Sequence, residues 1–312
     1  RQTFLSAKKH DYKCVKIKYA GGEPTLNFSL IIDLHQEAVQ LSNQYGIKLH
    51  EVIISNGVNI SNEILQKIRQ LGIALTISLD SVTYAHDIQR NLKGGGATHQ
   101  LVMDTINRAS ALGYKPDICI TVSKLNLNSL AQTVEWLMER DLVFSINFYR
   151  KINQVDDYEL EPNPEDLVLK LKEVYLIIKK KFPNRSLLSS LLDHTNLSFS
   201  HNHPCNAGLS YIVIDHKGDL FSCQMATDEV AGSIFGGDLL EQLNSNKSKS
   251  IFFPVDERTD CVKCEWKYWC AGGCPLIVRD GKFANSPYCR VYKQLIPEII
   301  LLEGYRLLSQ HN

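Results

Sequence analysis

The chain has 312 residues, 44% of them hydrophobic, which is enough for one large domain and a smaller one, each with its own core. Lys plus Arg and Asp plus Glu are equal at 34 each, which excludes an overall field that would recruit nucleic acid or an anionic membrane. No apolar run approaches the roughly 18–20 residues of a membrane span, and we find no secretory signal at the start. We therefore expect a cytoplasmic protein without a nucleic-acid or membrane partner.

Short apolar segments alternate with helical periodicity through the first half of the chain. The apolar segments that are rich in β-branched residues predict buried parallel strands at 15–24, 49–57, 74–80, 117–124 and 143–150. Helical spacing of apolar residues predicts helices over 28–46, 61–72, 98–113 and 128–141. This alternation predicts βα units and a parallel sheet, either as a barrel or as an open doubly wound sheet.

The predicted strands end in polar residues. These pairs are Gly22 and Glu23, Ser55 and Asn56, Ser78 and Asp80, Ser123 and Lys124, and Tyr149 and Arg150. Parallel α/β folds place their chemistry at the carboxyl ends of strands. One polar ending would be ordinary loop polarity, but five in succession favour a shared ligand site.

The second half of the chain has a different composition. A charged, Pro-containing stretch at 153–166 precedes a predicted helix at 167–182, and residues from about 195 onward are rich in Cys, His and Gly. Residues 211–225 predict a β-hairpin. Seven of the nine cysteines follow residue 200, which favours metal or iron–sulfur ligation over a disulfide framework.

The spacing of these seven cysteines indicates two soft-metal sites. It reads Cys-X12-Gly-X4-Cys over 205–223, then Cys-X2-Cys-X5-Cys-X3-Cys over 261–274, and finally Cys289. Thiolates suit both zinc and iron–sulfur clusters, so the spacing alone leaves both metals open.

This cysteine pattern resembles the SPASM domain of radical S-adenosylmethionine (SAM) enzymes. In the first half, GGEP at 21–24 resembles the SAM-binding motif of that family, and ISLD at 77–80 resembles its ribose-contacting strand. The resemblance covers nearly the whole chain and makes zinc improbable. It implies an α/β fold, with a partial (β/α)6 TIM-like barrel lacking its first strand over 1–190. A small Cys-rich SPASM domain with a β-hairpin and C-terminal helices would occupy 195–312.

The resemblance also implies the cluster ligands. A second auxiliary [4Fe–4S] cluster would be held by Cys261, Cys264, Cys270 and Cys289. The first would be held by Cys205, Cys223 and Cys274. Since residues 206–222 contain no cysteine, its fourth position would be open or taken by His201, His203 or the substrate.

The resemblance to radical SAM enzymes also implies that SAM binds at the strand ends. Its methionine amino group would meet Gly21, Gly22 and Glu23, and its ribose would lie near Ser78 and Asp80. Asn56 and Tyr149 are looser candidates. Arg90 could pair with the SAM carboxylate through two hydrogen bonds, or it could be a surface guanidinium.

One expected motif is missing. Family members carry Cys-X3-Cys-X2-Cys upstream of GGEP for the cluster that reduces SAM, whereas this sequence has only Cys14 there, which we expect, like Cys119, to be a small core residue. Because the sequence begins with Arg1 on an apparent helix tail, we expect an N-terminally truncated chain, inactive alone, whose parent holds the third cluster. The alternative is a protein that naturally lacks it.

The resemblance implies an enzyme that cleaves SAM reductively and abstracts a hydrogen atom. Its substrate would be a ribosomally made precursor peptide, modified or cross-linked, and its reductant a flavodoxin or ferredoxin. Anaerobic sulfatase-maturating enzymes are the nearest rival, but they carry an Asp base directly after the cysteine that matches Cys223, where this chain has Gln224. A cluster-bearing or zinc-bearing binding or electron-transfer module is the other alternative, and no catalytic residue is assigned.

Overall fold

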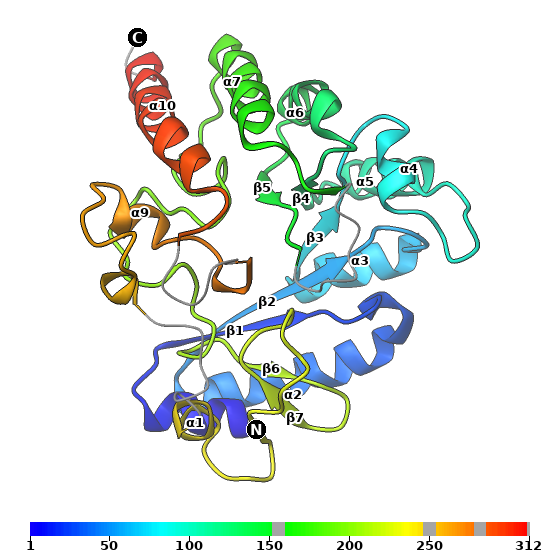
Figure 1. Cartoon of the computed structure of the whole chain (residues 1–312). Helices are drawn as coiled ribbons and strands as arrows, with labels where there is room; N and C mark the ends of the chain where they lie inside the picture. Colours follow the sequence, from blue (N-terminus) through cyan, green and yellow to red (C-terminus); the bar gives the residue numbers. More distant parts are fainter. Residues whose placement is uncertain (152–159, 246–253, 278–284, 311–312) are drawn as a thin grey trace. The chain divides into compact units, whose positions relative to one another are not determined.

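The computed structural model describes residues 1–151, 160–245, 254–277 and 285–310 (Figure 1). The chain forms two compact units, each assembled from two segments. The first unit comprises 1–54 with 205–253, and the second comprises 55–204 with 254–312. The division into 1–190 and 195–312 was predicted from the cofactor that each part of the sequence is expected to bind. That division stays a prediction.

The first unit begins with a helix, two parallel strands and the helix that joins them. Its elements are α1 (Gln2–Lys9), β1 (Cys14–Tyr19), η1 (Pro24–Asn27), α2 (Phe28–Tyr45) and β2 (Lys48–Ser55). The helix α2 ends at Gly46, whose φ of 65° lies in the left-handed region that favours glycine. The core of this part is the cluster Phe4, Ala7, Val15, Ala38, Leu41 and Ile47. Burial of one face of α2 against β1 therefore fixes this βαβ unit.

Side chains alternate along β1, and this alternation corrects one expectation. Val15 and Ile17 pack into the core cluster with α2, whereas Cys14, Lys16 and Lys18 are exposed. Cys14 was expected to be a small core residue, and this was wrong, because its position in the strand puts it on the face opposite α2. Cys119 is half-buried.

The second segment of the first unit carries the predicted hairpin. Strands β6 (Val213–Ile214), β7 (Asp219–Phe221) and β8 (Gly232–Ser233) form an antiparallel sheet, followed by α8 (Leu239–Ser245). The turn between β6 and β7 contains Gly218 at a φ of 86°. The hairpin predicted at 211–225 is confirmed. Lys9 of α1 pairs with Glu241 of α8 at 2.8 Å, which ties the two segments of the unit together.

The second unit is built on three parallel strands in chain order, β3 (Ala74–Ser78), β4 (Asp117–Val122) and β5 (Phe144–Phe148). Its helices are α3 (Asn62–Leu71), α4 (Ala85–Gln89), α5 (His99–Ala111), α6 (Leu130–Glu139), α7 (Pro164–Lys180), α9 (Lys267–Cys270) and α10 (Cys289–Ser309), with 3-10 turns η2 (Leu127–Ser129), η5 (Val255–Glu257) and η6 (Pro275–Ile277). Helix α7 packs against both α6 and α10.

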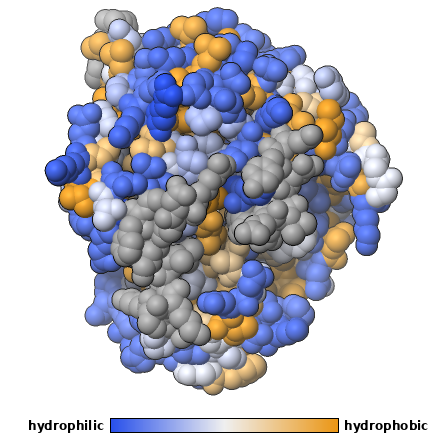
Figure 2. All heavy atoms as spheres, in the orientation of Figure 1, coloured by the Kyte–Doolittle hydropathy of each residue, from blue (hydrophilic) through white to orange (hydrophobic). Residues whose placement is uncertain are grey.

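The five predicted strands and the four predicted helices between them are confirmed. Their ends agree within two residues, except that the strand predicted at 15–24 ends five residues earlier, at Tyr19. The charged stretch at 153–166 lies largely outside the described residues. Hydrophilic residues dominate the face seen in Figure 2, with hydrophobic residues scattered among them. Within the described residues, no helix combines the length and the apolar character that a membrane crossing requires.

Gly57, directly after β2, offers a test of packing beside the expected ligand site. It has a φ of 75°, and a Cβ there would lie 2.8 Å from Ile77 Cγ2. Gly46 has a similar φ of 65°, but no atom lies within 4 Å of its Cβ position. Both Gly57→Ala and Gly46→Ala put a side chain on a residue with positive φ, which strains the backbone. Gly57→Ala also forces a methyl group against Ile77, so it should lower the free energy of unfolding by about 1–3 kcal/mol more than Gly46→Ala. Urea unfolding of both variants measures this, and equal losses would contradict it.

Candidate functional site

Four cysteines in the second unit line one pocket. Cys261 and Cys264 lie on consecutive turns after Arg258, Cys270 is the last residue of α9, and Cys289 is the first residue of α10. Asp260, Trp266, Lys267, Gly272, Asn285, Ser286, Tyr292 and Lys293 complete its lining. These four cysteines are the predicted ligands of the second auxiliary cluster. The structure thus brings the whole set together, although their ligand role stays a prediction.

Burial makes these thiols hard to ionise without a cation. Desolvation raises the pKa of Cys261 and Cys289 and raises that of Cys270 to about 12, and neighbouring thiols reinforce each shift. Arg258, which is fully buried and donates from Nη1 to the Gly272 carbonyl at 2.9 Å, opposes the shift at Cys261. A bound metal group would supply the positive charge that thiolates need at this place.

The donor set of this pocket suits a soft metal. Four thiols from three segments of the chain line it, and thiolates bind both zinc and iron–sulfur clusters. A cubane cluster binds each of its cysteines through a different iron. The residues present therefore fit the [4Fe–4S] cluster that the resemblance implies.

The predicted ligands of the first cluster are divided between the two units. Cys205 and Cys223 belong to the first unit, where both thiols help to raise the pKa of Tyr211, after burial. Cys274 is buried in the second unit, close enough to Arg150 to affect the pKa of that guanidinium. His201 and His203 also belong to the second unit. The shared cluster therefore stays a prediction.

The GGEP turn lies in the first unit, at the end of β1. Gly21 has a φ of 141°, and a Cβ on Gly21 or Gly22 would meet nothing within 4 Å. The Glu23 carboxylate accepts hydrogen bonds from the backbone N–H and the hydroxyl of Thr25, at 3.1 and 2.6 Å, and so caps η1. A carboxylate oriented beside an uncrowded Gly-Gly backbone suits an ammonium group.

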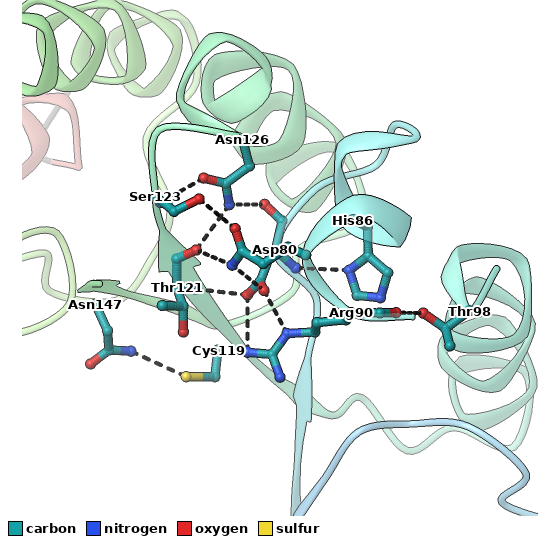
Figure 3. Close-up of polar contacts among 10 residues, drawn as sticks. Asp80, His86, Arg90, Thr98, Cys119, Thr121, Ser123, Asn126 and Asn147 are labelled. Carbon is teal, nitrogen blue, oxygen red and sulfur yellow. Dashed lines mark hydrogen bonds and ion pairs between the residues drawn. The ribbon is translucent and has the colours of Figure 1, made fainter. Parts of the chain in front are cut away.

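The carboxyl ends of β3 and β4 meet at the buried carboxylate of Asp80 (Figure 3). Asp80 accepts hydrogen bonds from the Thr121 backbone N–H at 2.8 Å and from Gln89 Nε2 at 2.6 Å, and it forms an ion pair with Arg90. Asn126 Nδ2 donates to the carbonyl of Asp80 at 2.8 Å, and also to that of Thr121 at 2.9 Å. The side chain of Asp80 has no exposed surface. This network holds the two strand ends and α4 in one arrangement.

The network defines what Arg90 and Asp80 can offer a ligand. Arg90 donates to Asp80 from Nε and from Nη2, so both N–H groups of Nη1 and the second N–H of Nη2 are left for a SAM carboxylate. The Arg90 side chain is 34% exposed. The Asp80 carboxylate already has four donors, and any effect on the ribose would come through the groups it positions.

The remaining SAM candidates lie at strand ends of the second unit, as expected. Ser78 is the last residue of β3 and is half-buried. Asn56 is exposed after β2, with its Oδ1 accepting from the Val58 N–H at 2.8 Å. Tyr149 follows β5, and its carbonyl accepts from the Tyr288 hydroxyl at 2.8 Å. Their contact with SAM stays a prediction.

Sequence reasoning missed three residues that organise this region. Gln89 bridges Asp80 and the Ser123 hydroxyl, and Asn126 is the third residue after Ser123, whose N–H it accepts at 2.8 Å. This Ser-X-X-Asn spacing is similar to that of a capping box, so it was a usable signal. Asp193 binds Arg150 Nη2 through both oxygens, at 2.6 and 2.7 Å, and no local pattern marks it.

Comparison with known proteins gives a match to one family model and several relatives. Residues 2–137 match the model of the Radical SAM superfamily. A cysteine-type anaerobic sulfatase-maturating enzyme of Clostridium perfringens is 22% identical over 303 residues, which cover 88% of this chain and 79% of that protein. An uncharacterized protein of Methanocaldococcus jannaschii is 32% identical over 160 residues, covering 49% of this chain and 52% of that protein.

Solved structures agree in fold. Native anSMEcpe with bound AdoMet and a peptide has a TM-score of 0.77 at 17% identity, covering 97% of this chain and 90% of that one. Streptococcus suis SuiB has a TM-score of 0.61 at 18% identity, covering 91% and 68%. At such identities the likeness shows the fold alone, and it confirms the α/β, partial TIM-like barrel expected from the sequence.

The Asp80 network gives a prediction about stability. Asp80→Asn replaces a carboxylate that has four donors by an amide that cannot accept them all. It should lower the free energy of unfolding by roughly 2–4 kcal/mol. Asp141→Asn is the control, since that carboxylate pairs with Lys115 at an exposed site and should cost about 0.5 kcal/mol or less. If urea unfolding gives similar losses for both, the network contributes no more than a surface ion pair.

Proposed function

We propose that this chain, whose residues 2–137 match the model of the Radical SAM superfamily, is a SPASM-type maturase that modifies or cross-links a ribosomally made precursor peptide. This match supports a radical SAM enzyme of the oxidoreductase type, and the fold is consistent with it. The observation that carries the proposal is the pocket that Cys261, Cys264, Cys270 and Cys289 line together. With the match of residues 2–137 to the Radical SAM model, this pocket supports the enzyme over a zinc-stabilised binding module.

The strand ends would bind and orient SAM. When bound and reduced, SAM and its cluster supply a radical that abstracts a hydrogen atom from the substrate. Glu23 would accept hydrogen bonds from the SAM ammonium, with Thr25 fixing the carboxylate. Arg90, anchored by Asp80, would hold the SAM carboxylate through Nη1, and Ser78 would lie near the ribose. Gly21, Gly22, Asn56 and Tyr149 complete the proposed site.

The seven C-terminal cysteines would hold two auxiliary clusters. Cys261, Cys264, Cys270 and Cys289 hold the second, and Cys205, Cys223 and Cys274 hold the first, with its fourth position open to another group. A third cluster, on a motif upstream of GGEP, would bind SAM. A flavodoxin or ferredoxin would supply the electron. Cys261, Cys270 and Cys274 are buried, and their burial would help to exclude water from the clusters.

A peptide substrate is supported by the relatives. The Clostridium perfringens protein is named a sulfatase-maturating enzyme, and one anSMEcpe structure contains a peptide. Sulfatase maturation itself is the second candidate function because of that similarity. Gln224 counts against it, since an amide occupies the position of the base, and its Oε1 accepts from the Tyr211 hydroxyl at 3.1 Å. Modification of another peptide is therefore the proposal we prefer.

SAM cleavage tests the assigned strand-end residues. The complete gene product, reconstituted anaerobically and reduced with dithionite, should form 5′-deoxyadenosine from SAM. Glu23→Gln should weaken SAM binding about 10- to 100-fold, because it removes a charge-assisted hydrogen bond. Glu63→Gln, on the exposed start of α3, is the matched control. Chromatography measures the product over a range of SAM concentrations. Absence of 5′-deoxyadenosine from the wild-type protein would refute the proposed function.

Iron content tests the cysteine pocket. Cys270→Ala should remove about four irons and four sulfides per chain, since one cluster loses a ligand that no other described cysteine can replace. Cys119→Ala is the control, because Cys119 lies on β4 and accepts a hydrogen bond from Asn147. Elemental analysis and the visible absorption of the reconstituted proteins give the result. Zinc without sulfide in the wild-type protein would contradict the assignment.

A further inference from the structure

One face of the β1–β2 pair carries an unusual concentration of positive charge. Because side chains alternate along a strand, Lys16 and Lys18 of β1 lie on the face opposite α2, as do Lys48 and His50 of β2. All four residues are exposed, and Lys16 is the direct register partner of His50. We refer to these four residues as the basic face. It stands out in a chain whose net charge is zero.

The lysines of the basic face have no carboxylate partners among the described residues, in contrast with Lys9, Lys115 and Lys267, which form ion pairs. The carboxylate of β2, Glu51, points to the other face. There it accepts hydrogen bonds from the Tyr19 hydroxyl at 2.5 Å and from His35 at 2.7 Å, with only 6% of its side chain exposed. The strand pair thus separates its charges, with the acid buried beneath α2 and the cations left unpaired on the opposite side.

The basic face adjoins two predicted ligands of the first cluster. Lys18 Nζ lies 5.1 Å from the centre of the Tyr211 ring, a cation–π distance. Cys205 and Cys223 both lie near enough to Tyr211 to affect the pKa of its hydroxyl, and Cys205 likewise affects Lys18. Desolvation, with the charge of Lys16, lowers the pKa of Lys18. An anion bound on this face would offset the electrostatic repulsion between Lys16 and Lys18.

We infer that the basic face binds an acidic segment of the peptide substrate in an extended conformation. The inference rests on the proposed function and adds the chemistry of the substrate to it. Lys16 and Lys18 are two residues apart on one strand, so they are spaced about 7 Å apart. Side chains on one side of an extended peptide have the same spacing, so carboxylates at alternate positions match these ammonium groups. Charge complementarity then places the acidic segment beside Tyr211, Cys205 and Cys223.

Peptide binding tests this inference in the complete, reconstituted protein. The probe is a fluorescein-labelled 12-residue peptide of alternating Glu and Ser, and the reference probe has Gln in place of Glu. Anisotropy at low salt should show binding of the Glu peptide that is several-fold tighter than that of the Gln peptide and that weakens as NaCl increases. Lys16→Gln with Lys18→Gln should weaken binding of the Glu peptide about three- to tenfold. Lys16→Arg with Lys18→Arg should retain it.

The control makes the same change in charge elsewhere. Lys93→Gln with Lys217→Gln removes two exposed lysines from loops and should leave the affinity unchanged. Equal losses in both double variants, or equal binding of the Glu and Gln peptides, would overturn the inference. Formation of 5′-deoxyadenosine is measured separately. If the protein cleaves SAM but does not prefer the acidic probe, the proposed function stands and the inference about the basic face is refuted. If it prefers the acidic probe but does not cleave SAM, the basic face binds acidic peptides and the proposed function is refuted.

Discussion

The buried carboxylate of Asp80 is the constraint on which the arrangement of the strand ends in the second unit depends. A charge without exposed surface must be compensated, and its four donors come from β4, α4 and the residue after α4. Once they converge, the ends of β3 and β4 have one arrangement. Arg90 is oriented in consequence, with Nη1 and the second N–H of Nη2 left as donors. The proposed ligand site at these strand ends would therefore be preorganised by a group that the ligand need not touch.

A second constraint acts at the cysteine pocket. Burial raises the pKa of three thiols there because it penalises thiolates, so binding through thiolates would need the positive charge of a metal centre. The turn after Arg258, the end of α9 and the start of α10 all supply ligands. Binding of a cluster would consequently connect these three segments. The hydrophobic core beside them is small and consists of Val255, Cys261 and Ala271.

Strands and helices were predictable because period and length are local properties. The segments at 15–24 and 28–46 show their periods directly, and Gly46 ends the helix where its backbone must turn left-handed. The four cysteines of one pocket were predictable through their spacing. The engagement of Arg90 by Asp80, ten residues earlier, was not, because either carboxylate or ligand could satisfy that guanidinium. The pairing of Arg150 with Asp193 depends on a contact across 43 residues, which no local pattern encodes.

The expectation for Cys14 shows how the same strand could have been read more fully. A strand buried on both faces is continuously apolar, whereas CVKIKY alternates. That alternation already indicates one covered face and one polar face, and it assigns Cys14 to the polar face with Lys16 and Lys18. β1 is an edge strand of its sheet, and lysines on such a strand can serve only to keep the edge soluble. Lys16, however, has His50 as its register partner, and Lys18 lies over the ring of Tyr211. These neighbours, with Cys205 close by, are the reason why we propose a binding surface here in addition to a protected edge.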